Sequence, residues 1–196
     1  MKRIAVLVSG GGTNLQALID AQGSTLRSGK IALVVSNAEG AFALERAKKA
    51  GIPTATVLKK QLGSQRAFED ALIALLEENH IDLIILAGFM TILTEHFTIR
   101  YPKRILNVHP SLIPSFCGEG YYGLRVHQAA LDYGVKVTGA TVHFVNEIPD
   151  GGEIIAQKAV YIEPGDTPQI LQRRVMEQAE WILLPQAAEA VCANLK

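Results

Sequence analysis

An amide side chain and an imidazole side chain stand two positions apart at the end of a strand-like segment. In "ILNVHPSLIPSFCGEGYYG", residues 105–123, Asn107 and His109 interrupt an apolar run that then passes into proline and glycine. The two-residue period of a strand places both side chains on one face. An amide donates a hydrogen bond to a developing oxyanion without changing charge, and an imidazole exchanges a proton near neutral pH. The pair therefore indicates attack on a carbonyl group, with a buried pair bonded to the backbone as the alternative.

A glycine-rich turn, "VSGGGTNLQ" at residues 8–16, joins the first expected strand to the first expected helix. Such a turn presents backbone N–H groups and the positive end of a helix dipole, which favour a phosphate. The dinucleotide pattern GxGxxG fails because Leu15 occupies the third glycine position, and the Walker pattern lacks its GK[ST] end. We expect a single phosphate, supported by Thr13 and Asn14, and a tight strand-to-helix turn without a ligand is the alternative.

A carboxylate, Asp150, lies in the turn-rich segment "NEIPDGG". Asp before Gly-Gly is ordinary turn chemistry, so the residue matters only if the fold brings it to His109. There it would orient the ring, raise the pKa of the imidazole and keep a proton available for a leaving nitrogen. A serine hydrolase is not indicated, because Ser111 lacks a GxSxG motif, and Cys117 has no clear base.

Strand-like and helical segments alternate through the first half of the chain. Both faces are apolar in "RIAVLV", "KIALVVS", "TATVL", "DLIILAG" and "RILNVH", as in buried strands, and the segments between them have helical spacing. The alternation predicts an α/β fold with three layers and an open, mostly parallel twisted sheet, with ligands at the carboxyl ends of its strands. Two consecutive strand-like runs at residues 135–145 and 152–162 predict a mixed extension of this sheet. A helical C-terminal segment follows, and we expect Pro185 to kink or divide it.

The composition indicates a neutral globular chain. It has 196 residues, 19 basic and 19 acidic, with 48% apolar residues, which fits a single domain over 1–196. The neutral charge disfavours a nucleic-acid partner, and the apolar runs are too short for a membrane span, so we expect a cytoplasmic chain. The cysteines and histidines lack metal-motif spacing, so no metal is expected. Monomer and homodimer both remain open.

The chain closely resembles the phosphoribosylglycinamide formyltransferase family, the folate-dependent transformylases of purine synthesis. The segments "VSGGGTNL", "LAGFM", "ILNVHPSLIPSF" and "GATVHFVNEIPDGGEII" carry the resemblance, in order, across nearly the whole chain. It implies a Rossmann-like formyltransferase fold. It also implies transfer of the formyl group of 10-formyltetrahydrofolate to the amine of glycinamide ribonucleotide in IMP biosynthesis, with these two small molecules as partners and no metal.

The resemblance further implies roles for individual residues. Asn107 would polarise the formyl carbonyl and stabilise the tetrahedral oxyanion, His109 would shuttle the proton, and Asp150 would hold His109 charged. The residues implied to bind the ribonucleotide are Gly12, Thr13, Asn14 and Glu180. The residues implied to line the folate site are Arg66, Met90, Thr91, Ile92, Leu93, Asn107, Asn146, Glu147, Ile148, Pro149 and Asp150.

The chain departs from the family pattern at three places. Thr91 stands where the family usually has arginine after "GFM", and we expect it to contribute mainly backbone to the folate pocket. The family's basic residue at the start of the third helix aligns with Gln65, with Arg66 next to it. The segment "GEGYYG" lengthens the loop after the catalytic strand, and its glycines predict either a lid or a plain surface loop.

Other functions share part of this pattern. A formyltetrahydrofolate hydrolase has the same Asn, His and Asp and passes the formyl group to water, but it normally has a further N-terminal domain and H-S-F-L-P in place of "HPSLIP". A methionyl-tRNA formyltransferase would need a longer chain with an RNA-binding domain. A non-catalytic nucleotide-binding α/β module would be favoured by substituted catalytic positions, and all three are intact.

Overall fold

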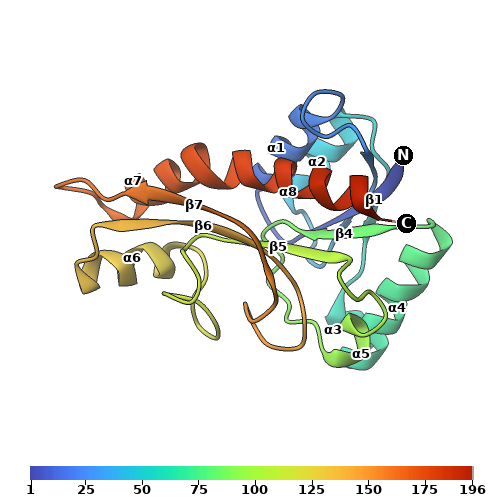
Figure 1. The fold of residues 1–196 in the computed structure, drawn as a ribbon. Helices are drawn as coiled ribbons and strands as arrows, with labels where there is room; N and C mark the ends of the chain where they lie inside the picture. Colours follow the sequence, from blue (N-terminus) through green and yellow to red (C-terminus); the bar gives the residue numbers. More distant parts are fainter. Residues whose placement is uncertain (196) are drawn as a thin grey trace.

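The computed structural model describes residues 1–195 as a twisted sheet between two layers of helices (Figure 1). The strands are β1 (Lys2–Val8), β2 (Gly29–Ser36), β3 (Thr54–Thr56), β4 (Leu83–Leu86), β5 (Ile105–His109), β6 (Val137–Phe144) and β7 (Ile154–Tyr161). They form one seven-stranded sheet in the order β3-β2-β1-β4-β5-β6-β7. The pairs from β3 to β5 are parallel, whereas β6 runs antiparallel to both of its neighbours. The predicted mixed, mostly parallel sheet is confirmed.

Helices cover both faces of this sheet. One face carries α1 (Thr13–Ala21), α2 (Phe42–Lys49) and the C-terminal run of α7 (Pro168–Val175), the π-helix η1 (Met176–Glu180) and α8 (Trp181–Asn194). The other face carries α4 (Gln65–Glu78) and α5 (Glu95–Thr98), with the short α3 (Lys59–Leu62) beside α4. A further helix, α6 (Leu124–Tyr133), packs against α7. Within residues 1–195, no helix has the length and apolar character to cross a membrane.

The central strands form two separate cores because both of their faces are buried. Along β1, Ile4 and Val6 pack with the helices of one layer, and Ala5 and Leu7 pack with those of the other. All of β4 is buried. Burial of each large apolar side chain contributes about 1.5–3 kcal/mol, so the strands form a firm base for the loops at their ends.

The strand register brings several loops to the same edge of the sheet. Leu7 of β1 pairs with Leu86 of β4, Leu86 pairs with Asn107 of β5, and Asn107 pairs with His143 of β6. The carboxyl ends of β1 and β4 are therefore level with Asn107. In an open α/β sheet this is the edge at which ligands bind.

The sequence analysis expected Pro185 to kink or divide the C-terminal helical run, but the run is not divided there. Helix α8 continues through Pro185, and the irregular turn is η1, which directly precedes α8. A π-turn inserts an extra residue into the helix and changes which side chains face inward. Its last residue is Glu180, which is buried.

Candidate active site

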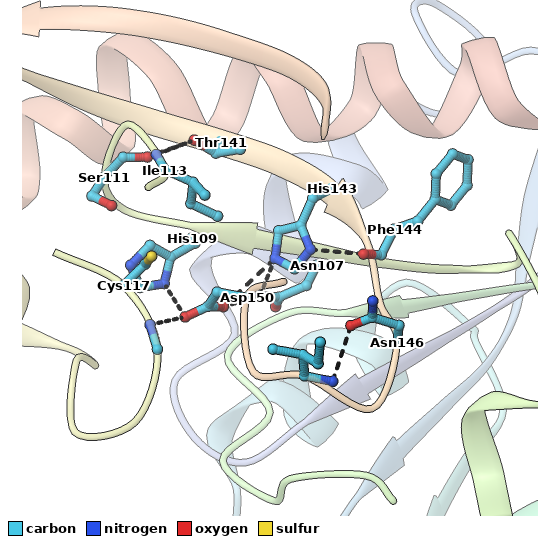
Figure 2. A network of polar contacts seen from close by, with 12 residues as sticks. Asn107, His109, Ser111, Ile113, Cys117, Thr141, His143, Phe144, Asn146 and Asp150 are labelled. Atoms are coloured by element: carbon cyan, nitrogen blue, oxygen red, sulfur yellow. Dashed lines mark hydrogen bonds and ion pairs between the residues drawn. The ribbon is translucent and has the colours of Figure 1, made fainter. Parts of the chain in front are cut away.

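The three residues predicted to be catalytic lie together where β5 and β6 meet the segment 145–153 (Figure 2). Asp150 Oδ2 is 3.4 Å from His109 Nδ1, and Asp150 Oδ1 is 3.5 Å from Asn107 Nδ2. The backbone of Asp150 is left-handed, with φ of 54°, a conformation that Asp adopts more readily than most residues. The contact between Asp150 and His109, on which the predicted role of Asp150 depends, is therefore present.

A fourth side chain, His143, joins this group, and the sequence analysis did not single it out. His143 Nδ1 is 2.8 Å from the Phe144 carbonyl oxygen, and His143 Nε2 is 3.2 Å from Asn107 Nδ2. When Nδ1 carries the proton and donates to the carbonyl, Nε2 accepts from the Asn107 amide. One amide N–H is then held by His143, and the second is directed toward Asp150. The sequence signal was present, since His143 lies shortly before Asp150 in the family block.

Both ring nitrogens of His109 face hydrogen-bond acceptors. Nδ1 faces Asp150, and Nε2 lies 2.9 Å from the Phe116 carbonyl oxygen, so only the protonated ring donates on both sides. Burial nevertheless lowers the pKa of His109 below its ordinary value, although Asp150 and the Phe116 carbonyl act to raise it. Asp150 thus acts on the pKa of His109 in the expected direction, but burying the cation has the larger effect. That Asp150 keeps His109 charged stays a prediction. A ring that releases its proton readily suits a proton shuttle better than a fixed charge.

Asp150 remains a carboxylate at neutral pH. Burial acts to raise its pKa, but His143, with Nε2 3.6 Å from Oδ1, the nearby His109 and the Gly118 N–H lower it, and the net direction is downward. The Gly118 N–H donates to Oδ2 at 2.8 Å. The negative charge is therefore held by several donors next to His109.

The loop predicted to be either a lid or a surface loop, with the residues just before it, contacts both of these residues. The Gly118 N–H, at its start, donates to Asp150, and the carbonyl of Phe116, two residues before it, accepts from His109. Gly118 and Gly120 have φ of 87° and 86°, which favours glycine at both positions. Movement of this loop stays a prediction.

The glycine-rich turn meets Glu180 at the same edge of the sheet. Gly12, with φ of 72°, precedes α1, and Asn14 Nδ2 donates to Glu180 Oε2 at 2.8 Å. Asn14 Oδ1 is buried and has no partner within residues 1–195. Burial raises the pKa of Glu180 to about 7, although the bond from Asn14 acts to lower it. The structure thus joins two of the residues that the resemblance assigned to the ribonucleotide.

The substitution Glu180→Gln is expected to remove a pH-dependent loss of stability. The pKa of Glu180 is about 7 in the folded chain and 4.5 ordinarily. The contribution of the protonated Glu180 to the free energy of unfolding is therefore fully present below pH 4.5 and is lost as the pH rises through 7. This shift corresponds to about 3 kcal/mol in the free energy of unfolding. Urea unfolding at pH 5 and pH 8 should show that the variant gains stability relative to the wild type at pH 8. An equal difference at both pH values would contradict this expectation.

The segment predicted to line the folate site is held by the residues that directly follow β1 and β2. The Met90 N–H donates to Ser9 Oγ at 2.8 Å, and Thr91 Oγ1 accepts from Asn37 Nδ2 at 2.7 Å. Met90 and Ile92 are exposed, whereas Leu93 is buried. The side chain of Thr91 is therefore bonded within the protein, which agrees with a mainly backbone contribution to a ligand site.

The structure distinguishes Gln65 from Arg66. Gln65 Nε2 donates to the Ile92 carbonyl at 3.1 Å and to Glu69 Oε1 at 2.7 Å. The Arg66 side chain is 67% exposed and lies 3.3 Å from Asp70 Oδ2. Gln65 thus contacts the expected folate segment, whereas Arg66 is directed into solvent and pairs with its own helix.

The second expected folate segment, Asn146 to Asp150, borders a cavity of about 290 Å³. Asn146 and Glu147 line this cavity together with Phe144 and residues from α5 and the turn after it. Glu147, Ile148 and Pro149 are exposed. Within residues 1–195, no cluster of three or more His, Cys, Asp or Glu side chains has the arrangement of a metal site.

A buried imidazole, His127 on α6, lies near His109. It has no exposed surface, and neither ring nitrogen has a partner within residues 1–195. Burial lowers the pKa of His127 to about 4, and the nearby His109 acts in the same direction. The ring is therefore neutral at physiological pH.

The substitution His127→Leu is expected to make the chain less sensitive to acid. The folded pKa of about 4 lies below the ordinary 6.5, so the stability contribution is present above pH 6.5 and is lost as pH falls toward 4. Between pH 6.5 and pH 4, the free energy of unfolding falls by up to about 3 kcal/mol because of this group. Urea unfolding at pH 7 and pH 5 should show a smaller drop for the variant, whereas His80→Asn, at an exposed site with φ of 50°, should keep the wild-type drop. Equal drops for wild type and His127→Leu would contradict the buried neutral ring.

The comparison with known protein families shows to which family this chain belongs. Residues 2–187 match the formyl transferase family. The chain belongs to this family, and the resemblance to formyltransferases that the sequence indicated is confirmed.

Individual relatives narrow the comparison. The phosphoribosylglycinamide formyltransferase of Haemophilus influenzae is 47% identical over 178 residues, which are 91% of this chain and 82% of that protein. The trifunctional purine biosynthetic protein adenosine-3 of Gallus gallus is 46% identical over 192 residues, which are 98% of this chain but only 18% of that protein. The chain thus spans less than a fifth of that relative. The crystal structure of glycinamide ribonucleotide transformylase 1 from Symbiobacterium toebii has a TM-score of 0.92 at 40% identity, covering 98% of this chain and 88% of that one.

Proposed function

We propose that this chain transfers the formyl group of 10-formyltetrahydrofolate to the primary amine of glycinamide ribonucleotide. The products would be formylglycinamide ribonucleotide and tetrahydrofolate, in purine biosynthesis. The observation that carries the proposal is the convergence of Asn107, His109 and Asp150 in a chain of the formyl transferase family. Small-molecule partners and a cytoplasmic location are part of the same proposal.

The proposed reaction is an acyl transfer through a tetrahedral intermediate. The substrate amine attacks the formyl carbon, the carbonyl becomes an oxyanion, and the bond from that carbon to N10 of the folate then breaks. The Asn107 N–H directed toward Asp150 Oδ1, at the long distance of 3.5 Å, would donate to the oxyanion instead when substrate is bound. With its Nε2 released from the Phe116 carbonyl, His109 would take a proton from the attacking amine and deliver one to N10. The Asp150 carboxylate, facing Nδ1, would stabilise the transient imidazolium.

The two substrates would bind to different parts of the site. The turn at Gly12, Thr13 and Asn14 would hold the phosphate of the ribonucleotide, with Glu180 contacting the same substrate. The folate would lie between the segments 90–93 and 146–150, which flank the catalytic group. The fixed bonds to Met90 and Thr91 support a preformed pocket on that side.

A steady-state absorbance assay of folate turnover tests this proposal. We expect turnover of 10-formyltetrahydrofolate to depend on glycinamide ribonucleotide and to saturate with it. Equal turnover without the ribonucleotide would overturn the transferase proposal and favour the hydrolase. No turnover under either condition would favour a non-catalytic nucleotide-binding module.

A further inference from the structure

The carbonyl groups of three consecutive glycines in the turn after β1 all accept hydrogen bonds from α1 or α2. The Gly10 oxygen accepts from the Ala43 N–H at 3.0 Å, and the Gly12 oxygen accepts from the Gln16 N–H at 2.9 Å. The middle carbonyl, that of Gly11, accepts instead from a side chain, Arg46 Nε, at 2.8 Å.

These bonds determine where the N–H groups of the turn point. In a planar trans peptide the N–H is directed opposite to the C=O. The N–H groups of Gly11, Gly12 and Thr13 belong to the same peptides as the carbonyls of Gly10, Gly11 and Gly12. They therefore point away from the donors that bind those carbonyls. Within residues 1–195, none of these three N–H groups has an acceptor. They form a set of free donors at the start of α1.

We infer that Arg46 is a positioning residue that orients this turn for the phosphate of the substrate. Arg46 lies on the carbonyl side of the Gly11–Gly12 peptide, so it acts through the backbone and does not itself contact the anion. The inference rests on the proposed function, since it names what aligns the phosphate-binding donors. The other two donors to these carbonyls are backbone N–H groups, whereas Arg46 donates from its side chain. A substitution at Arg46 therefore removes one of the three bonds and leaves the backbone donors in place.

The guanidinium of Arg46 is itself held in a fixed orientation. It lies 5.0 Å from the centre of the Phe42 ring, and its Nη1 donates to Gln16 Oε1 at 3.1 Å. Gln16 in turn donates to Asp20 Oδ1 at 2.8 Å. A lysine has one ammonium in place of this planar fork, and it does not replace arginine where two acceptors and a ring are contacted together.

The packing of α2 against the turn is close on the same side. A Cβ atom at Gly12 would lie 2.6 Å from Ala43 Cβ, and Gly12 also has φ of 72°. The turn is thus fixed by contact with α2 as well as by the Arg46 bond. A small displacement of the Gly11–Gly12 peptide would change the direction of its N–H.

Lys49 provides a matched control for charge. It lines the same cavity of about 300 Å³ as Arg46, together with Gln16, Phe42 and Ala50. Within residues 1–195, no hydrogen bond joins Lys49 to the turn. Lys49→Gln therefore removes a nearby positive charge and leaves the bond to Gly11 in place.

The test compares the wild type with Arg46→Ala, Arg46→Lys and Lys49→Gln. We expect both Arg46 variants to raise KM for glycinamide ribonucleotide at least about tenfold, the scale of a lost charge-assisted hydrogen bond. KM for 10-formyltetrahydrofolate, kcat at saturation and the circular dichroism spectrum should stay near the wild-type values. Lys49→Gln should change the ribonucleotide KM less than about twofold, as expected for an exposed charge.

Binding of inorganic phosphate, followed by ³¹P NMR titration, separates this inference from the proposed function. We expect phosphate to bind the wild type and Lys49→Gln and to bind both Arg46 variants at least about tenfold more weakly. A wild type that binds phosphate but does not use the ribonucleotide would overturn the proposed function alone. Absence of phosphate binding to the wild type, equal binding by the Arg46 variants, or a normal Arg46→Lys beside a defective Lys49→Gln would overturn the positioning role.

Discussion

The substitution His109→Gln is expected to lower kcat by at least about 100-fold, the usual scale for removing a group that transfers protons. The ring is buried and placed between Asp150 and the Phe116 carbonyl, so its removal takes away the titratable group that faces Asp150. Glutamine retains a donor that reaches toward the carbonyl, but it does not take up and release a proton. KM for both substrates should change little.

The matched control for this prediction is His96→Gln. His96 Nε2 lies 2.6 Å from Asp70 Oδ1, away from the catalytic group, so the same chemical change should leave kcat near the wild-type value. Rapid-quench or steady-state measurement of tetrahydrofolate formation gives both rates. A His109→Gln enzyme with more than about a tenth of wild-type kcat would remove His109 from the proton-transfer role.

The substitution Asp150→Asn is expected to have an effect of similar size, again at least about 100-fold in kcat. Asparagine is the appropriate replacement because it tolerates the left-handed backbone at φ of 54°. It removes the charge that stabilises the protonated His109 ring. Near-wild-type kcat would reduce Asp150 to an ordinary turn residue.

The pH dependence of the Asp150→Asn enzyme gives a second readout. Asp150 acts to raise the pKa of His109 against the effect of burial, so its loss should lower that pKa further. The limb of the kcat/KM profile that reports His109 should therefore move to lower pH in the variant. The control, Asp132→Asn on the exposed side of α6, should keep the wild-type profile.

The fold was largely predictable because the signals for its elements are local. Each expected strand in the first half is present, since apolar β-branched runs between amphipathic segments allow few other arrangements. The alternation of Asn107 and His109 placed both on β5. The rule for ligand sites at strand ends directed attention to the edge where these two residues and Asp150 lie together.

The parts that were not predictable depend on contacts between distant segments. His143 reaches Asn107 only because β6 pairs antiparallel with β5 in one register. Glu180 reaches Asn14 where η1 departs from the regular α-helix, and helical periodicity assumes a regular helix. The net pKa of His109 depends on how completely the ring is buried, which no pattern of residue types specifies.

The segment predicted to bind folate was likewise predictable in part. The segment 90–93 was predicted from its motif, but the bond from Gln65 to Ile92 and the outward direction of Arg66 depend on how α4 packs beside that segment. Likewise, the sequence indicated a phosphate turn at residues 10–14 but not the side chain of α2 that binds its middle carbonyl.

The fate of a labelled formyl group tests formyl transfer most directly. The wild-type chain would be incubated with 10-formyltetrahydrofolate carrying ¹³C in the formyl group, with and without glycinamide ribonucleotide, and followed by ¹³C NMR. The proposed function predicts that the label appears as the formamide of the ribonucleotide, in equal amount to the tetrahydrofolate formed. Label that appears as free formate at the same rate with and without the ribonucleotide would contradict it.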